Sequence, residues 1–242
     1  MATTRIYVDL DLSVQKQLEL PEVAGNHVGR VLRMRVSDPL ILFNGQGGEF
    51  IAKITSVNRA KVNVEISTFV NQERESTLRI TLGQALSKGD KMDFTIQKAV
   101  ELGVNNITPL LTRYSNVRLD ENKLDKKLEH WRKVIISACE QCGRNTIPEL
   151  ADITKVDDWV PHTKADLKLL LAPDAESSLS DLDEKPESIC IVIGPEGGLS
   201  RSEIRSLEDN NFTGIRLGPR ILRTETAGLT TVAALQNQFG DY

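Results

Sequence analysis

Two turns near the C-terminal end of the chain carry the residues best suited to chemistry. The first, Gly194–Gly198 with the sequence GPEGG, follows the apolar run Ile189–Ile193. The second, Gly218–Thr226, follows the run Ile215–Leu217. Glycine lets backbone N–H and C=O groups approach a small ligand with no side chain between them. Both turns would lie at the carboxyl edge of an α/β sheet, where ligands usually bind.

Glycine turns also occur in purely structural loops, and GPEGG alone does not decide between the two interpretations. The second turn favours a functional site, because polar and charged side chains follow its strand directly and a structural loop seldom needs so many. They are Arg220, Arg223, Thr224, Glu225 and Thr226.

Each turn leads into a predicted helix start. Ser200 and Glu203 have the Ser-x-x-Glu spacing of a capping box. Thr224 is expected to be the N-cap of the last helix, and Glu225 follows where a negative charge suits the helix dipole.

The two motifs, IGPEGGLSRSEI and LGPRILRTETA, closely resemble the paired C-terminal motifs of the SPOUT methyltransferases. Over essentially its whole length the chain resembles the RsmE family, which methylates N3 of a uridine in 16S ribosomal RNA of the small ribosomal subunit. The resemblance implies an α/β fold, with a SPOUT-type knotted parallel-sheet methyltransferase domain at 73–242. It also implies a small PUA-like β-barrel RNA-binding domain at 1–72. The trefoil knot is implied by the resemblance alone.

The cofactor implied by the resemblance is S-adenosyl-L-methionine, and no metal is expected. Main-chain groups and apolar side chains of the two turns should grip this methyl donor, together with the end of the run Leu167–Leu171. The residues expected to bind it are Leu171, Gly194, Pro195, Glu196, Gly197, Gly198, Leu217, Gly218, Ile221, Leu222, Thr226 and Ala227.

Methylation of uridine N3 requires loss of the imide proton, so a base or a stabilising cation is expected near the acceptor. Arg220 or Arg223 could supply the cation. Glu225 or Glu196 could be the base, and Glu225 could equally be only a helix-start residue. Since base pairing hides the N3 edge, the target must be single-stranded or extruded.

The N-terminal part reads as short strands with one helix, followed by a linker at 71–77. The sequence NGQGG between two of the runs predicts a hairpin. The expected strands are Ile6–Val8, Leu18–Leu20, Leu40–Phe43, Glu49–Ile54 and Lys61–Ile66.

The predicted helix Glu22–Leu32 and the residues after it contain cations but no acid between Glu22 and Asp38. Helical spacing puts His27, Arg30 and Arg33 on one face, with Val28, Val31 and Leu32 facing inward. The planar guanidinium of arginine suits phosphate. A solvated basic face is the plainer alternative, but NHVGRVLRM resembles the N-terminal motif of the family, which favours RNA contact.

Further RNA contacts are expected from basic residues that match family positions. Three lysines lie in or after SKGDKM, one arginine follows the helix end EQCG beside Glu140 and Gln141, and one lies in TRIYV. They are Lys88, Lys91, Lys98, Arg144 and Arg5.

The remaining pattern predicts a β–α–β unit, in which strand Leu78–Ala85, an amphipathic helix and strand Ile107–Leu111 make a parallel pair. Leu119–Cys142 should be the longest helix. The family uses the last, alanine-rich helix in a dimer, so a homodimer is expected.

The composition is that of a soluble globular protein, with 40% hydrophobic and 26% charged residues in 242 and a net charge of −4. The acidic stretch 174–187 supplies much of that charge and reads as a solvated loop. No run of about 18 apolar residues indicates a membrane span. Three cysteines make no disulfide framework, which fits a cytoplasmic protein.

Two alternatives remain open. The chain could be a non-catalytic RNA-binding ribosome assembly factor of the same fold, although such a protein would have little reason to keep RILRTETA. A phosphate could also be captured at the helix start of Ser200, but the lysine of a P-loop is missing there.

Overall fold

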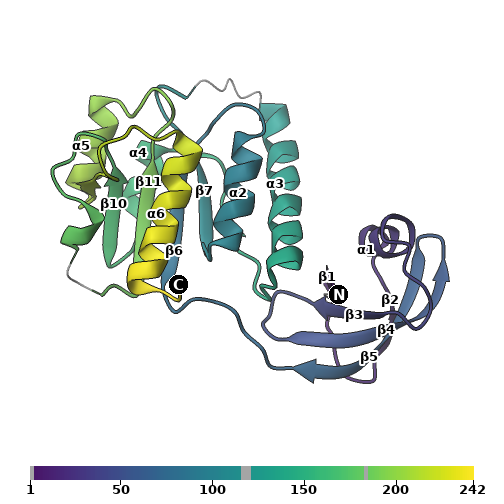
Figure 1. Ribbon diagram of the computed structural model, residues 1–242. Coiled ribbons are helices and arrows are strands. Elements are labelled where there is room, and N and C mark those ends of the chain that lie inside the picture. Colours follow the sequence, from purple (N-terminus) through teal and green to yellow (C-terminus); the bar gives the residue numbers. More distant parts are fainter. Residues whose placement is uncertain (1–2, 116–120, 183–184) are drawn as a thin grey trace. The chain divides into compact units, whose positions relative to one another are not determined.

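The computed structural model describes residues 3–115, 121–182 and 185–242 (Figure 1). The chain divides into two compact units. One comprises Met1–Glu75 with Cys139–Ile147, and the other comprises Ser76–Ala138 with Pro148–Tyr242.

The N-terminal unit is built on a five-stranded sheet of order β1-β3-β4-β5-β2. Its strands β3, β4 and β5 pair antiparallel, β2 pairs antiparallel with β5, and β1 runs parallel to β3. The hairpin predicted at NGQGG is confirmed as the β3–β4 connection. The strands are β1 (Thr4–Tyr7), β2 (Gln17–Glu19), β3 (Pro39–Phe43), β4 (Glu49–Asn58) and β5 (Lys61–Val70).

The helix of this unit begins as predicted but buries a different face. It consists of α1 (Glu22–Asn26) continued by a π-helical turn, His27–Val31. Val28 is buried, whereas Val31 is 67% and Leu32 is 42% exposed, so the prediction that these two face inward is wrong. The reason is close backbone approach. A Cβ atom on Gly25 or Gly29 would lie within 2.3 Å of a carbonyl oxygen in the β4–β5 turn, so the glycine face packs inward.

The second unit is a seven-stranded sheet of order β12-β10-β11-β6-β7-β8, with β9 also paired to β7. All pairings in this sheet are parallel. The predicted parallel pair of the β–α–β unit is confirmed as β6–β7. The strands are β6 (Arg79–Ala85), β7 (Asn106–Leu111), β8 (Glu149–Leu150), β9 (Thr154–Lys155), β10 (Leu167–Leu171), β11 (Ser188–Ile193) and β12 (Thr213–Ile215).

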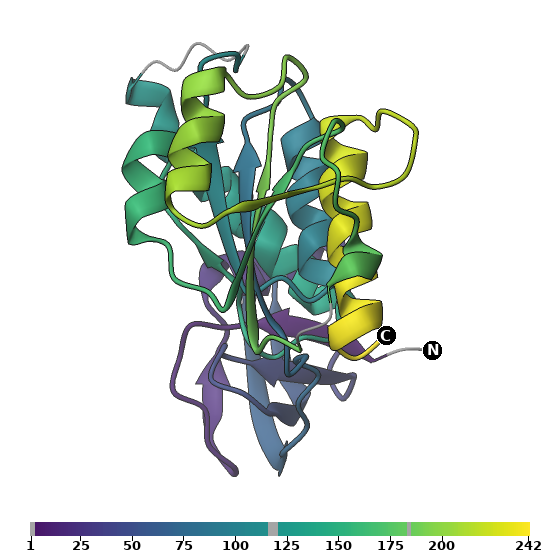
Figure 2. The ribbon, with the colours of Figure 1, turned by 90° about the vertical axis from the view of Figure 1, so that its left-hand side faces the viewer.

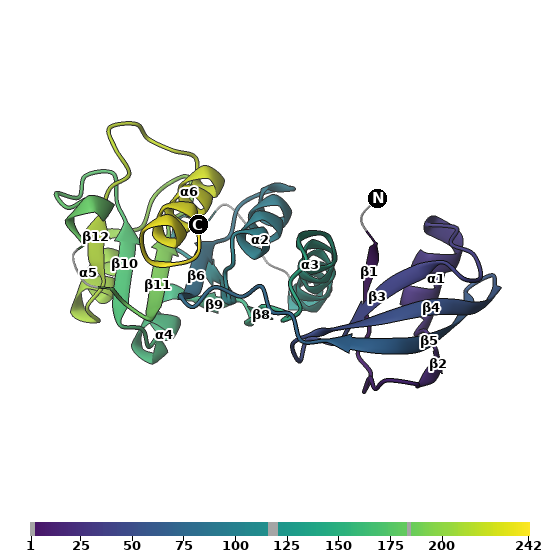
Figure 3. The ribbon, with the colours of Figure 1, turned by 60° about the horizontal axis from the view of Figure 1, so that its bottom comes forward.

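Helices cover both faces of this sheet. Figure 3 shows α2 (Lys91–Glu101) and α6 (Thr224–Phe239) on one face and α4 (Val156–Trp159) and α5 (Arg201–Asp209) on the other. In Figure 2 the sheet is seen between α5 and α6. Being covered on both sides explains why the central strand β11 (SICIVI) is a continuous apolar run rather than an alternating one.

The longest helix, α3 (Glu121–Cys142), has the end predicted from the sequence. The first residues of the predicted helix, 119–120, lie outside the described residues. Within the second unit, α3 is tied to α2 through one carboxylate, since Asp93 accepts from Trp131 Nε1 at 2.9 Å and lies 2.6 Å from His130 Nε2.

Of the two predicted helix starts, the structure confirms the one at Ser200 and contradicts the one at Thr224. Ser200 and Glu203 form the capping box at the start of α5. The prediction that Thr224 caps α6 is wrong, because Arg223 occupies the N-cap position and Thr224 is the first helical residue. The Thr224 hydroxyl is buried and donates to a carbonyl of the other turn instead.

Candidate active site

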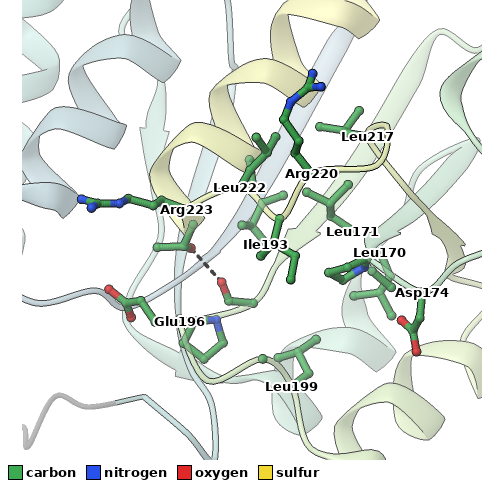
Figure 4. Close-up of a pocket in the computed structure, with 18 of the residues that line it drawn as sticks. Leu170, Leu171, Asp174, Ile193, Glu196, Leu199, Leu217, Arg220, Leu222 and Arg223 are labelled. Carbon is green, nitrogen blue, oxygen red and sulfur yellow. Dashed lines mark hydrogen bonds between the residues drawn. The ribbon is translucent and has the colours of Figure 1, made fainter.

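A cavity of about 570 Å³ lies at the carboxyl ends of β10 and β11, between the two glycine turns and the start of α6 (Figure 4). This volume is in the usual range for a small-molecule site. Its lining consists of Leu170, Leu171, Ala172, Pro173, Asp174, Ile193, Gly194, Pro195, Glu196, Gly198, Leu199, Ile204, Leu217, Gly218, Arg220, Ile221, Leu222, Arg223, Thr224 and Ala227.

Most residues predicted to bind the donor line this cavity. Two do not. Gly197 lies against Tyr114, since a Cβ atom on this glycine would be 3.0 Å from the Tyr114 Cβ. Thr226 is exposed in the first turn of α6.

The cavity also contains residues that the sequence analysis did not select. Apolar ones include Leu170 and Ile193 at strand ends, Leu199 in the loop before α5, and Ile204 on α5. The strand-end residues could have been predicted, because they belong to the apolar runs directly before each turn. Asp174 was missed because it belongs to the acidic stretch, which read as a solvated loop.

The cavity has an apolar interior and a charged rim. Figure 4 shows Leu170, Leu171, Ile193 and Leu222 around its centre, with the carboxylates of Asp174 and Glu196 at opposite sides. Such walls accommodate a flat ring, and rim carboxylates can accept hydrogen bonds from hydroxyl or ammonium groups.

Two cavity glycines hold backbone conformations that other residues adopt poorly. Gly198 has φ of +72° and Gly218 has φ of +66°, both in the left-handed region. In the described part of the chain, no atom lies within 4 Å of the Cβ position of either glycine. The backbone angle, rather than lack of space, therefore requires glycine at both positions.

A buried chain of hydrogen bonds joins the two turns. Gln84 Nε2 donates to Thr224 Oγ1 at 2.9 Å, and Thr224 Oγ1 donates to the carbonyl oxygen of Gly194 at 2.7 Å. The second bond is the dashed line in Figure 4.

A third turn reaches the same rim. Lys91, the first residue of α2, places Nζ 3.0 Å from Glu196 Oε1 and 3.5 Å from Glu225 Oε2. The backbone N–H of Glu196 and the ammonium group of Lys91 hold the pKa of the Glu196 carboxyl below its ordinary value, although burial opposes them. Glu225, predicted as a base, therefore lies beside Lys91 and does not line the cavity.

The two predicted catalytic arginines line the cavity, but their guanidinium groups point away from its apolar centre (Figure 4). Both side chains are exposed. Among the described residues, neither Arg220 nor Arg223 forms a salt bridge, so both charges are available to a ligand.

The predicted RNA-binding residues fall into three groups. Arg30, Arg33 and Lys88 are exposed, and His27 is half-buried. Lys98 pairs with Glu101 at 2.8 Å within α2. Lys91 is paired with carboxylates as described above.

Arg144 and Arg5 correct the RNA-binding prediction, because their side chains are paired inside the protein and are not exposed. Arg144 is 4% exposed, and its Nε donates to Glu75 Oε1 at 2.8 Å. The Arg5 guanidinium forms a salt bridge with Glu49, and its Nη2 donates to Asn145 Oδ1 at 2.6 Å. Both cations lie largely inside the N-terminal unit, where Arg144 pairs with half-buried Glu75 and Arg5 pairs with buried Glu49 instead of facing solvent.

The part of the chain that the structure describes contains neither a candidate metal cluster nor a candidate membrane helix. In residues 3–115, 121–182 and 185–242, no group of three or more His, Cys, Asp or Glu side chains could hold a metal ion. No helix in these ranges is long and apolar enough to cross a membrane.

Family models and known proteins match this chain in both of its parts. The family model of an RNA methyltransferase domain matches residues 74–236, and that of an RNA methyltransferase PUA domain matches residues 21–67. The ribosomal RNA small subunit methyltransferase E of Buchnera aphidicola is 40% identical over 241 residues, which cover 98% of this chain and 97% of the relative. This chain belongs to that methyltransferase family.

Other members agree in sequence and in structure. The Bacillus subtilis protein of the same name is 33% identical over 88% of this chain and 87% of its own. A putative methyltransferase from Legionella pneumophila, solved with the bound cofactor SAM, superposes with a TM-score of 0.98 at 45% identity, covering all of both chains. The Neisseria gonorrhoeae family member, solved with S-adenosyl methionine, has a TM-score of 0.95 at 37% identity over 99% of both chains.

Proposed function

We propose that this chain transfers the methyl group of S-adenosylmethionine to N3 of a uridine in 16S ribosomal RNA. The observation that carries the proposal is the cavity between the two glycine turns, with its apolar interior, accessible main chain and rim carboxylates. Family membership and the relatives solved with S-adenosylmethionine support the choice of donor.

The donor would be held chiefly by shape and main chain. Its adenine suits the apolar centre around Leu171, Ile193 and Leu222. Asp174 and Glu196 are placed to accept hydrogen bonds from ribose hydroxyl groups or from the amino group of the methionine tail. Methyl transfer is an in-line displacement, so catalysis depends on holding the acceptor nitrogen against the methyl carbon.

Activation of uridine N3 would rely on a cation more than on a strong base. Lys91 lies beside both Glu196 and Glu225, and the lowered pKa of Glu196 makes that carboxylate a weak proton acceptor. Arg223 and Arg220 border the cavity with unpaired charges among the described residues. We infer that one of them stabilises the uracil oxygens as negative charge develops.

RNA would be recognised outside the donor cavity by the exposed cations. Arg30 and Arg33 lie on the N-terminal unit together with half-buried His27. Exposed Lys88 belongs to the turn between β6 and α2. Phosphate contacts of this kind position the RNA without reading its sequence.

A non-catalytic assembly factor with the same fold is the alternative. It would have no need for an open donor cavity, so the cavity favours the enzyme. We further propose that the protein acts as a homodimer in the cytoplasm, as the family resemblance implies. Sedimentation of the purified chain at micromolar concentration tests the dimer, and a sedimenting monomer would contradict it.

The decisive experiment supplies methyl-labelled S-adenosylmethionine and small ribosomal subunits from a strain lacking this protein. We expect label at one uridine of the 16S RNA, and a stop of reverse transcription there because an N3 methyl blocks base pairing. Subunits from a strain that keeps the protein are the control and should accept no label. Label on a ribose 2′-oxygen would overturn the N3 assignment, and no label would favour the assembly factor.

A further inference from the structure

We propose that Gln84 and Thr224 are positioning residues for methyl transfer. Their hydrogen bonds fix the two glycine turns relative to each other and thereby hold the donor cavity in its binding shape. The inference rests on the proposed use of the cavity for S-adenosylmethionine.

The directions of the hydrogen bonds follow from the chemistry of the groups. The carbonyl oxygen of Gly194 can only accept, so the single hydroxyl hydrogen of Thr224 must point to it across 2.7 Å. The Thr224 oxygen then accepts from the Gln84 amide nitrogen at 2.9 Å. Reversing the amide would place two acceptors against each other. The chain Gln84–Thr224–Gly194 thus has one consistent polarity.

This chain of bonds joins three separate segments of the second unit. Gln84 lies on β6 in register with Ile193 of β11, the residue before Gly194. Thr224 begins α6, directly after the cavity residues Ile221–Arg223. Gly194 begins the GPEGG turn. The exposed segment that leads into α6 is therefore anchored to both central strands at the point where it meets the cavity.

The amide of Gln84 is less stabilising at this position than an apolar side chain of the same size would be. Gln84 is 0% exposed, and its Oε1 has no hydrogen-bond partner among the described residues. A methionine would fill similar space without an unpaired buried acceptor. Gly228 of α6 makes room for the amide, since a Cβ atom there would lie 2.9 Å from Gln84 Oε1. Stability alone does not account for glutamine here, whereas positioning of Thr224 does.

The test compares three threonine variants of the full-length protein. Thr224→Val removes the hydroxyl and keeps the shape, and Thr224→Ser keeps the hydroxyl. Thr231→Val is the matched control, because Thr231 lies on the same helix, is 0% exposed and donates to the Ala227 carbonyl at 2.8 Å without joining the turns. Donor affinity is measured by calorimetry with S-adenosylmethionine, melting temperature by calorimetric scanning, and KM and kcat with small-subunit RNA.

We expect Thr224→Val to weaken donor binding by about tenfold, the scale of one hydrogen bond lost from a buried acceptor. The loss should appear in KM for the donor, and Thr224→Ser should restore affinity to within about threefold of wild type. Thr231→Val should lower the melting temperature about as much as Thr224→Val does, but it should leave donor affinity unchanged.

Two results would overturn the positioning role while leaving the proposed function intact. One is wild-type donor affinity in Thr224→Val, and the other is equal loss of affinity in Thr231→Val. A double variant adds a further check, since Gln84→Met combined with Thr224→Val should bind no more weakly than Thr224→Val alone if both act through one chain. A wild-type protein that fails to bind S-adenosylmethionine would overturn the proposed function together with this inference.

Discussion

Lys91 Nζ lies 3.0 Å from Glu196 Oε1, and this ion pair connects the turn after β6 with the GPEGG turn after β11. Glu225 of α6 is the second partner of the same ammonium group at 3.5 Å. One cation therefore contacts carboxylates from two other turns at the same sheet edge. The same ion pairs reduce the charge that Lys91 can offer to RNA phosphate.

Lys91→Met should weaken donor affinity about fivefold, because Glu196 and Glu225 would then repel each other at the rim of the cavity. The difference from wild type should shrink in concentrated salt, which screens the repulsion. Calorimetric titration with S-adenosylmethionine at two salt concentrations measures both effects. Lys133→Met is the control, since Lys133 forms an exposed 2.7 Å pair with Glu129 on α3, away from the cavity. Equal donor affinity in both variants would refute the role of Lys91.

Gly198→Ala should destabilise the turn by about 1–2 kcal/mol, because a residue with a Cβ atom is strained at φ of +72°. The turn would relax to other backbone angles, and donor affinity should fall with stability. Gly45→Ala is matched to it, since Gly45 has φ of +83° and lies in the β3–β4 hairpin of the N-terminal unit, where the nearest atom among the described residues is 3.4 Å from its Cβ position. We expect the control to lose similar stability in urea unfolding and to bind the donor normally. Normal binding by Gly198→Ala would argue against a backbone requirement at the cavity.

Arg30→Ala combined with Arg33→Ala should lower RNA affinity and flatten its dependence on salt. Losing two phosphate contacts reduces the slope of log K against log salt by about 1.4 for single-stranded RNA. Filter binding of a small-subunit RNA fragment at four salt concentrations gives the slope. Arg144→Ala should instead destabilise the N-terminal unit, because it removes the buried cation that pairs with half-buried Glu75. An unchanged slope in the double variant would remove these arginines from the RNA surface.

The stability of the N-terminal unit should depend on pH through Glu49. Burial acts to raise the pKa of Glu49, but hydrogen bonds from Arg5 and Arg74 outweigh it, so that pKa lies below its ordinary value. A carboxyl whose pKa is lowered by folding stabilises the fold above its ordinary pKa, near 4.5, and this contribution disappears as pH falls through the folded value.

Glu49→Gln should therefore cost about 2 kcal/mol at pH 7, as expected for hydrogen bonds to a charged group. The cost should shrink as the pH falls below the ordinary pKa near 4.5. Urea dependence of hydrogen exchange in β3 and β4, corrected for intrinsic rates, reports this unit separately. Glu65→Gln removes an exposed 3.7 Å pair with Lys53 and should have little effect at either pH. A cost that does not change with pH would contradict the argument.

Local patterns were enough to predict much of this fold. The GPEGG turn, the Ser200–Glu203 capping box, the β3–β4 hairpin and the parallel β6–β7 pair all follow from short-range rules on backbone geometry, capping and hydrophobic period. Most residues that line the cavity were also predictable, because they adjoin two turns with distinctive sequences.

The sequence by itself determined that two glycine turns follow buried strands and that the chain belongs with SPOUT-type methyltransferases. Only the tertiary structure decided which charges and hydroxyls are used inside the protein. Thr224 binds Gly194 rather than its own helix, Lys91 pairs with Glu196, and Arg144 is buried against Glu75. The partners in these pairs are 30, 105 and 69 residues apart in the chain. Burial and partner choice at such separations depend on packing, which no local pattern encodes.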